Sequence, residues 1–375
     1  VVRQIETLPS TAKDELGVPD ACLMFFDQVL AFDHVKKEIH LIATADLTRE
    51  DRKGAYDRAV RRLNKLERRL AGALPKQKRR AVTGKLKLTA RTSKASFLKA
   101  VNRTKEYIAS GDVFQCVLSQ RFDCTPGVPA FDIYRALRIV NPSPYMYFLR
   151  FGLQKNGQKN APITVGHIVG SSPELLVRVH DRGVEYRPIA GTRGRGADEI
   201  TDRALEADLR ADEKEVSEHI MLVDLGRNDV GRVSEFGSVK VKDLMFVERY
   251  SHVMHLVSSL EGKLKPELEA IDAFKACFPA GTLSGAPKIR AMEIIEEMEP
   301  ARRGVYGGSI FYADFSGNLD SCIAIRTLFM DGAKGYIQAG AGIVADSIPE
   351  KEFEECGNKA RAVVRAIERA RQYPN

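Results

Sequence analysis

Apolar residues recur along this chain with two spacings, each typical of one kind of element. Runs rich in aromatic and β-branched residues, bounded mostly by Gly, Pro or Asp, predict β-strands. Such runs lie near residues 21–34, 38–45, 113–124, 145–152, 163–170, 174–179, 184–188, 252–260, 308–313, 321–330 and 334–343. Many neighbouring runs are close enough to be joined as hairpins, which favours antiparallel pairing.

Helical spacing of apolar residues predicts the remaining elements. One strongly basic helix is indicated within residues 49–80 by Ala59, Leu63, Leu66, Leu70 and Leu74, and Gly72 with Pro75 ends it. Further helices are predicted near residues 93–108, 130–140, 202–222, 268–274, 286–298 and 350–371. Helices and strands alternate irregularly, so we predict an α+β fold with mostly antiparallel sheets and not a doubly wound parallel one.

Composition adds the size of the core and the sign of the charge. The chain has 375 residues, 44% of them hydrophobic, which is enough to bury a sizeable core. Its formal charge of +8 is concentrated in the basic helix and its exit, residues 49–80. That stretch lacks the interleaved aromatic residues of a base-stacking surface, and no nucleic-acid motif follows it. We therefore expect no nucleic-acid partner.

Cysteine usage and hydropathy indicate the compartment. The six cysteines include no CxxC pair, which argues against a zinc knuckle or a disulfide framework and fits a reducing cytoplasm. No apolar run approaches the ~18 residues that span a bilayer, and no signal peptide opens the chain, so no membrane association is expected. The chain begins with Val1 rather than Met, and we interpret residues 1–90 as the remnant of an N-terminal region and residues 91–375 as the catalytic domain.

Two distant segments each carry a glutamate pair at three-residue spacing, which places both side chains on one helix face. The pairs are Glu215 with Glu218 and Glu352 with Glu355. Such pairs usually mark a solvated surface, but apolar residues follow both along their helices. If the two faces lined one cavity, a hard divalent cation would relieve the repulsion between the carboxylates. The leading hypothesis is Mg²⁺ chemistry on an anionic substrate.

The glycine-rich segments "GTLSGAPKIRAM" and "QAGAGIVADS" do not match nucleotide-binding motifs. The first lacks the Lys-Ser/Thr ending of a phosphate-binding loop, and the second lacks a third glycine. Both allow close backbone approach to a small anion, and simple turns explain them equally well. His252 and His255 point to opposite faces of a predicted strand, and His255 alone fits a hydrogen-bonded core residue. Arg326, directly after the apolar "CIAI", calls for an anionic partner.

Nine ordered motifs together resemble the chorismate-utilising enzyme family. They are "SSPELLVR", "PIAGTRGRG", "DEKEVSEHIMLVDLGRND", "VMHLVSSLEG", "FPAGTLSGAPKIRAMEIIEE", "YGGSIFY", "DSCIAIRT", "QAGAGIVADS" and "EFEECGNKA". The resemblance begins near residue 93 and is dense from residue 171 to the C-terminus. It implies two stacked, mostly antiparallel sheets flanked by outer helices, with a site for chorismate and Mg²⁺ between them.

The resemblance also implies roles for individual residues. Glu218 and Glu355 would bind Mg²⁺ directly and Glu215 and Glu352 through water, so that the metal holds the ring carboxylate of chorismate. The residues that would bind the carboxylates of the substrate are Tyr306, Arg326, Gly340, Gly342 and Lys359. The residues that would border its ring are Gly191 and Thr192.

Three residues would act on the reacting ring. Glu174 matches a general acid that protonates the departing 4-hydroxyl, a role that needs a raised pKa. His255 matches the histidine linked to elimination of pyruvate, and Thr282 matches a threonine near the ring. Isochorismate and salicylate synthases carry a water-activating lysine where Gln115 stands, and aminodeoxychorismate synthases carry a lysine nucleophile where Ala190 stands. Direct attack of ammonia at carbon 2, giving anthranilate and pyruvate, is therefore the implied reaction.

The resemblance finally implies a partner and a regulator. No glutamine-hydrolysing module is visible, so ammonia is expected from a separate glutamine amidotransferase subunit. Part of a tryptophan-binding allosteric pocket is matched by Pro144, Tyr145, Met146 and Cys322, whereas the "LLES"-type segment that completes it is lacking. Two alternatives remain: the first component of aminodeoxychorismate synthase, and a catalytically inactive fragment that only binds an amidotransferase.

Overall fold

Two units make up the computed structural model, which describes residues 2–48, 51–74, 82–154, 163–250 and 253–372. The smaller unit spans Asp20–Arg80, and the larger one consists of Val1–Pro19 and Ala81–Pro374. None of the helices in the described residues is long and apolar enough to cross a membrane.

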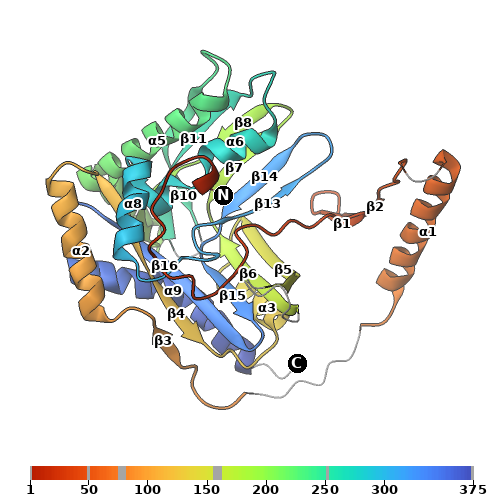
Figure 1. The fold of residues 1–375 in the computed structure, drawn as a ribbon, viewed down its shortest axis with the longest axis horizontal. Helices are drawn as coiled ribbons and strands as arrows, with labels where there is room; N and C mark the ends of the chain where they lie inside the picture. The colour runs from red at the N-terminus through yellow and green to blue at the C-terminus, as the bar shows by residue number, and fades with distance from the viewer. Residues whose placement is uncertain (1, 49–50, 75–81, 155–162, 251–252, 373–375) are drawn as a thin grey trace. The chain divides into compact units, whose positions relative to one another are not determined.

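In the smaller unit, a two-stranded antiparallel sheet accompanies one long helix (Figure 1). Strands β1 (Gln28–Asp33) and β2 (Glu38–Ala43) pair as a hairpin, and α1 (Arg52–Ala71) follows. The Asp51 carboxylate accepts a hydrogen bond from Gly54 N and so caps the first turn of α1. The helix buries only Ala55 and Ala59 and ends before Gly72, as the sequence predicts.

Two seven-stranded sheets form the larger unit, and every ladder between their strands is antiparallel. The first sheet has the order β10-β11-β8-β7-β14-β13, with β9 also paired to β11. Its strands are β7 (Leu175–His180), β8 (Gly183–Tyr186), β9 (Ile189–Gly194), β10 (Lys240–Arg249), β11 (Val253–Lys263), β13 (Ser309–Ala313) and β14 (Leu319–Ile323).

The second sheet has the order β12-β4-β16-β15-β6-β5, with β3 also paired to β4. Its strands are β3 (Leu88–Ala90), β4 (Gln115–Cys124), β5 (Tyr145–Leu153), β6 (Thr164–Ser172), β12 (Gly285–Ala286), β15 (Thr327–Asp331) and β16 (Lys334–Ile343). Side chains of both sheets meet in one apolar cluster, where Cys322 of β14 packs with Tyr147 and Phe329 of the second sheet. The two sheets are therefore stacked.

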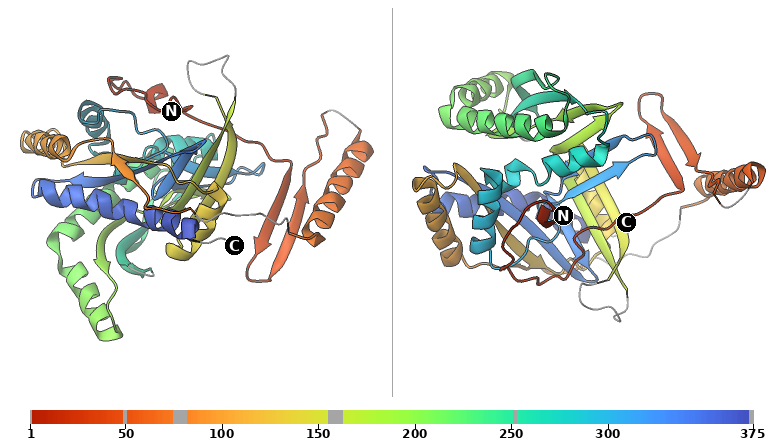
Figure 2. Two further views of the ribbon diagram at one scale, coloured as in Figure 1. Left: turned by 90° about the horizontal axis from the view of Figure 1, so that it is seen from below. Right: turned by 45° about the horizontal axis from the view of Figure 1, so that its top comes forward.

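Helices cover the outer faces of the two sheets (Figures 1 and 2). On the first sheet lie α5 (Glu213–Val233) and α6 (Ala270–Cys277), and on the second lie α3 (Ala130–Val140) and α9 (Pro349–Gln372). The remaining helices are η1 (Val2–Gln4), α2 (Lys94–Ala109), α4 (Glu199–Ala211), α7 (Gly281–Ser284) and α8 (Lys288–Met298). The α+β fold of two stacked antiparallel sheets flanked by helices is thus confirmed.

Two predicted elements are wrong in a way that matters for the site. The strand predicted over 321–330 is two strands in different sheets, because the chain crosses between the sheets at residues 324–326, where Arg326 has φ 48°. The helix predicted over 202–222 is broken at Asp212, whose extended backbone ends α4 and whose carboxylate caps α5 through Lys214 N and Glu215 N. The sequence pattern also does not predict β9 or β10.

Candidate active site

The end of β16 brings together four of the residues assigned to substrate binding. A Cβ on Gly340 would lie 2.7 Å from the Tyr306 hydroxyl oxygen, so only glycine leaves room for this contact. The Lys359 ammonium, on α9, donates a 3.1 Å hydrogen bond to the Gly340 carbonyl. Gly342 lies two residues further along the same strand and therefore shares a face with Gly340.

Gln115 of β4 connects this strand to the first glutamate pair. Its Nε2 donates a 2.7 Å hydrogen bond to Glu218 Oε1. A Cβ on Gly342 would lie 2.5 Å from that nitrogen and 3.7 Å from Glu218 Oε1. The amide oxygen of Gln115 is buried and has no hydrogen-bond partner among the described residues. The carboxylate of Glu218 thus lies beside the end of β16, and an unused acceptor lies next to it.

The second glutamate pair reaches the same stretch of β16 from α9. Glu355 Oε1 forms a 2.7 Å ion pair with Lys359, the residue that also binds Gly340. Burial raises the pKa of Glu352, and the charge of Glu355 raises it further. The ammonium of Lys214 lies close enough to lower the pKa of Glu352 in turn. The starts of α5 and α9 are therefore near neighbours.

Glu215, the other member of the first glutamate pair, lies beside β9. Its Oε2 would be 3.3 Å from a Cβ on Gly191, whose φ of +71° is the left-handed conformation that favours glycine. Burial raises the pKa of Glu215, and the charge of Glu218 adds to the shift. Arg193 Nη1 lies 3.5 Å from Glu215 Oε1. Each pair therefore holds one carboxylate whose ionisation is opposed by burial and by its own neighbour.

The four carboxylates do not form a ready-made metal cage. Within the described ranges, no three His, Cys, Asp or Glu side chains are gathered closely enough to hold a cation. The carboxylates approach as two pairs, and both pairs have polar partners: Gln115 donates to Glu218, Arg193 lies 3.5 Å from Glu215, and Lys359 pairs with Glu355.

His255, on β11, directly faces Thr192 on β9. Its Nδ1 is 3.0 Å from Thr192 Oγ1 and 3.1 Å from the carbonyl oxygen of Gly191. Because a carbonyl only accepts, the second contact requires a proton on Nδ1 and leaves the lone pair on Nε2. Burial lowers the pKa of His255 to about 4. The imidazole is therefore neutral near pH 7, with Nε2 available as a base. His252 lies outside the described residues.

Glu174 and Thr282 form a second hydrogen-bonded pair. Thr282 Oγ1 donates a 2.8 Å hydrogen bond to Glu174 Oε1. Burial raises the pKa of Glu174 to about 7, although the Thr282 hydrogen bond and the charges of Lys359 and Arg326 act in the opposite direction. A carboxyl group with such a pKa can hold a proton near neutral pH and release it to a substrate oxygen.

Arg326 provides the cation expected after the "CIAI" segment. It lies where the chain crosses between the sheets, and burial lowers the pKa of its guanidinium despite the opposing charge of Glu174. No hydrogen bond or ion pair joins this guanidinium to another side chain in the described part of the chain. A half-buried cation that has no side-chain partner among the described residues favours an anionic ligand.

The four residues matched to a tryptophan pocket do not all face one space. Tyr145 and Cys322 belong to the apolar cluster between the sheets, and the Tyr145 hydroxyl donates a 3.0 Å hydrogen bond to Asp320 Oδ1. Met146 packs on the opposite face, in the cluster beneath α3 and α9. Pro144 is exposed and precedes β5. Only Tyr145 and Cys322 are brought together.

Sequence reasoning missed three polar residues around His255. Arg193 binds Asp208 and Asp212 in addition to Glu215. The ring of Tyr250 meets the imidazole of His255 edge to face, with centroids 5.5 Å apart. Arg195 Nη1 donates a 2.7 Å hydrogen bond to the carbonyl of Tyr250. The two arginines of "GTRGRG" were the available signal, because guanidinium groups commonly pair with carboxylates.

Comparisons with known proteins indicate the family of the chain. The family model for a chorismate binding enzyme matches residues 1–365. Anthranilate synthase component 1 of Acetivibrio thermocellus is 50% identical over 99% of this chain and 74% of its own length. The protein of the same name from Pseudomonas aeruginosa is 49% identical over 99% of this chain and 73% of its own.

Structural similarity points to the same relatives. The crystal structure of anthranilate synthase component I from Streptococcus pneumoniae superposes with a TM-score of 0.85 at 40% sequence identity. The alignment covers 97% of this chain and 78% of that one. With a family model over nearly all residues and relatives of such high identity, the chain belongs to the chorismate-binding enzyme family.

Proposed function

We propose that this protein is the chorismate-converting subunit of an anthranilate synthase, which turns chorismate and ammonia into anthranilate and pyruvate for tryptophan biosynthesis. The observation that carries the proposal is the identity of 48 to 50% to several proteins named anthranilate synthase component 1, over almost the whole chain. We assign the chemistry to residues 91–375. The cytoplasm is the expected compartment, since none of the six cysteines is paired.

The donor set suits Mg²⁺, because all four candidate ligands are carboxylates. Glu218 and Glu355 would hold the ion directly, and Glu215 with Glu352 through water. The raised pKa values of Glu215 and Glu352 support this assignment, since a cation would relieve the repulsion that contributes to both. When bound, Mg²⁺ holds the ring carboxylate of chorismate and offsets its negative charge.

Cationic and hydroxyl groups around β16 would bind the carboxylates of the substrate. Arg326 offers a half-buried guanidinium, Lys359 an ammonium that donates to the Gly340 carbonyl, and Tyr306 the hydroxyl of a buried side chain. Gly340 and Gly342 keep this strand open to close approach, because any side chain there would meet Tyr306 or Gln115. Gly191 and Thr192, next to His255, would border the ring.

Two proton-transfer groups fit the two steps of the reaction. In the first, Glu174 gives its proton to the departing 4-hydroxyl while ammonia forms a bond to carbon 2. In the second, neutral His255 takes part in the elimination that expels pyruvate and leaves the aromatic ring. Thr282 adjusts the pKa of Glu174 through its hydrogen bond, and Thr192 orients the imidazole of His255. One buried acid and one neutral base provide the opposite functions that the steps need.

The nucleophile is assigned from two side chains. Ala190 has only a methyl group and cannot form the covalent adduct available to a lysine. Gln115 donates to Glu218 and has no basic group with which to activate water. Ammonia is therefore the preferred nucleophile, supplied by a glutamine amidotransferase subunit that forms the second component. Tyr145 and Cys322 mark the part of a tryptophan pocket that we assign to this chain.

Incubation of the purified protein with chorismate, MgCl₂ and excess ammonium near neutral pH tests the proposal. We expect fluorescent anthranilate and an equal amount of pyruvate, and no product when Mg²⁺ is removed with a chelator. Accumulation of 4-amino-4-deoxychorismate would instead support the first component of aminodeoxychorismate synthase. Binding of an amidotransferase subunit without any turnover would support an inactive fragment.

A further inference from the structure

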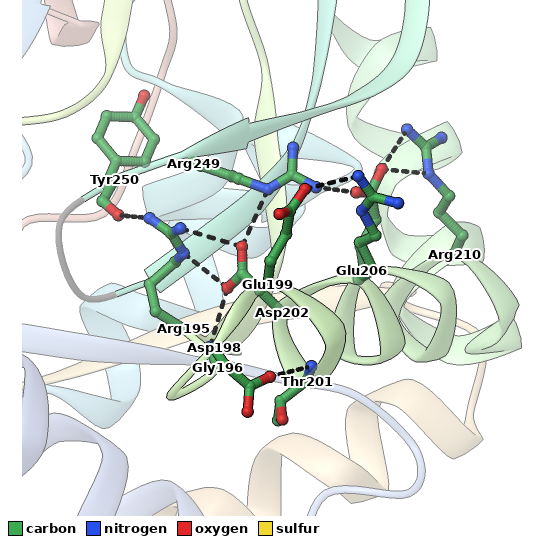
Figure 3. Close-up of polar contacts among 11 residues, drawn as sticks. Arg195, Gly196, Asp198, Glu199, Thr201, Asp202, Glu206, Arg210, Arg249 and Tyr250 are labelled. Atoms are coloured by element: carbon green, nitrogen blue, oxygen red, sulfur yellow. Dashed lines mark hydrogen bonds and ion pairs between the residues drawn. The ribbon is translucent and has the colours of Figure 1, made fainter.

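Asp202 is not one of the proposed catalytic groups, yet its carboxylate accepts four hydrogen bonds (Figure 3). This residue of α4 is buried, with 6% of its surface exposed. Arg195 binds it with two nitrogens, Nε at 2.7 Å and Nη2 at 3.0 Å. Gly196 N donates at 2.8 Å and Arg249 Nε at 3.1 Å. One carboxylate thus pairs with two guanidinium groups.

These partners come from the ends of two strands on either side of His255. Arg195 and Gly196 directly follow β9, and Arg249 is the last residue of β10. The fit is close, because a Cβ on Gly196 would lie 2.3 Å from the backbone nitrogen of Asp202. Asp202 therefore holds the end of β9 against α4 and ties the end of β10 to the same point.

Further contacts extend the tie toward the active site. Arg195 Nη1 donates to the carbonyl of Tyr250, the residue whose ring packs against His255. Glu206, one turn along α4 from Asp202, is a second partner of Arg249. In Figure 3 both carboxylates face the end of β10 from the same helix. The cluster of Arg195, Asp202, Glu206 and Arg249 is called the clamp below.

We propose that Asp202 is a positioning residue: through the clamp it fixes the Gly191 and Thr192 wall and the Tyr250 wall around His255. The inference rests on the proposed function for the identity of the reaction that is affected. β9 pairs with β11 up to Gly194, and Arg193 binds Asp208 and Asp212, so the clamp adds a tie at Arg195, just beyond the end of the strand. A loosened end of β9 shifts Thr192 and the Gly191 carbonyl, which together orient the imidazole.

The test compares Asp202→Asn with Glu199→Gln, a change of one carboxylate to its amide on the same helix. Glu199 is exposed, and its one ion-pair partner among the described residues is Arg203. In hydrogen–deuterium exchange without substrate, Asp202→Asn should speed exchange in residues 189–196 and 245–256 while β4 and α9 keep the wild-type rate. A merely structural role would instead speed exchange throughout and lower the unfolding temperature in proportion.

Kinetics provide the second readout. Asp202→Asn should lower kcat/KM for chorismate by roughly tenfold and slow pyruvate release more than amination, whereas Glu199→Gln behaves as the wild type. Arg195→Lys, which keeps the charge but loses the two-nitrogen contact, should change both readouts in the same direction and by less. If Asp202→Asn fails to fold, Arg195→Lys replaces it in both experiments.

The outcomes separate this inference from the proposed function. Wild-type exchange rates in residues 189–196 and 245–256 of Asp202→Asn would overturn the clamp, and so would an unchanged balance between amination and pyruvate release. If the wild-type protein makes no anthranilate, the proposed reaction fails while the exchange experiment still decides the clamp.

Discussion

Thr282 Oγ1 donates a 2.8 Å hydrogen bond to Glu174 Oε1, which joins two side chains that are 108 positions apart in the chain. Glu174 lies between β6 and β7, and Thr282 lies on the short helix α7. The contact links two otherwise separate motifs, and it stabilises the ionised form of a carboxyl group whose pKa burial raises to about 7. The balance of burial and this hydrogen bond sets the pH at which Glu174 holds its proton.

The first prediction concerns pH. Glu174 is protonated below its pKa of about 7 and loses the proton above it, so kcat/KM for chorismate should fall as pH rises through that value. Thr282→Val removes a hydrogen bond that favours the carboxylate, so it should move this descending limb to higher pH. Thr282→Ser keeps the hydroxyl and should leave the limb in place. Rate profiles from about pH 6 to about pH 9 test this prediction. If Glu174→Gln kept the same descending limb, the assignment would be contradicted.

The second prediction concerns the metal. Glu355→Ala should weaken Mg²⁺ binding by at least about a hundredfold, because it removes a direct ligand. The free energy of unfolding should change by less than about 1 kcal/mol, since the Glu355 pair with Lys359 is half-exposed and spans one helical turn. Calorimetric titration with MgCl₂ measures the affinity, with the exposed neighbour Glu354→Ala as control. Equal affinities in both variants would remove Glu355 from the metal site.

The third prediction separates the two chemical steps. His255→Ala should slow pyruvate release by roughly 10²-fold to 10⁴-fold while amination proceeds, so that the aminated intermediate accumulates. Chromatography of quenched reactions detects that intermediate, and a coupled assay follows pyruvate. The exposed histidine His180, changed to Ala, provides the control. A parallel slowing of both steps, without the intermediate, would show that His255 does not act in elimination.

The fourth prediction tests the contact between Gln115 and Glu218. Gly342→Ala places a methyl carbon 2.5 Å from Gln115 Nε2, so the amide must move and release the carboxylate of Glu218. We expect Mg²⁺ affinity and kcat/KM to fall by roughly tenfold each.

Gly357→Ala is the matched control, because nothing lies within 4 Å of its added Cβ on α9. That change should keep wild-type activity and stabilise the helix by up to about 1 kcal/mol. If Gly342→Ala bound Mg²⁺ as the wild type does, the amide of Gln115 would have no part in placing Glu218.

Local patterns predicted most elements and missed those defined by tertiary contacts. Helix α3 spans Ala130–Val140, the range expected from its apolar spacing. The stretch 321–330 reads as one apolar run, yet it divides at Arg326 because its halves belong to different sheets. No local signal marks that crossing, since both halves are equally buried. Strand β10 escaped prediction because most of its side chains are exposed or half-buried, which weakens the alternating pattern.

For the site, the motifs identified the candidate residues, and the fold determined their pKa values and hydrogen-bond partners. The resemblance assigned Glu174 and His255 their roles, but only burial in the folded protein moves the pKa of one up to about 7 and of the other down to about 4. The hydrogen bonds from Gln115 to Glu218 and from Lys359 to Gly340 connect segments that the sequence alone leaves unrelated. Asp202 had no motif to mark it as more than a helical carboxylate.

The sequence by itself determined the periodicity of the elements, the family and the set of ionisable side chains, because these depend on residue type and spacing. Only the tertiary structure decided which of those side chains meet, which are buried and which carry a proton near pH 7. The physical reason is that desolvation and charge pairing act over a few ångströms in space, and residues such as Glu174 and Thr282 come within that range only after the two sheets have stacked.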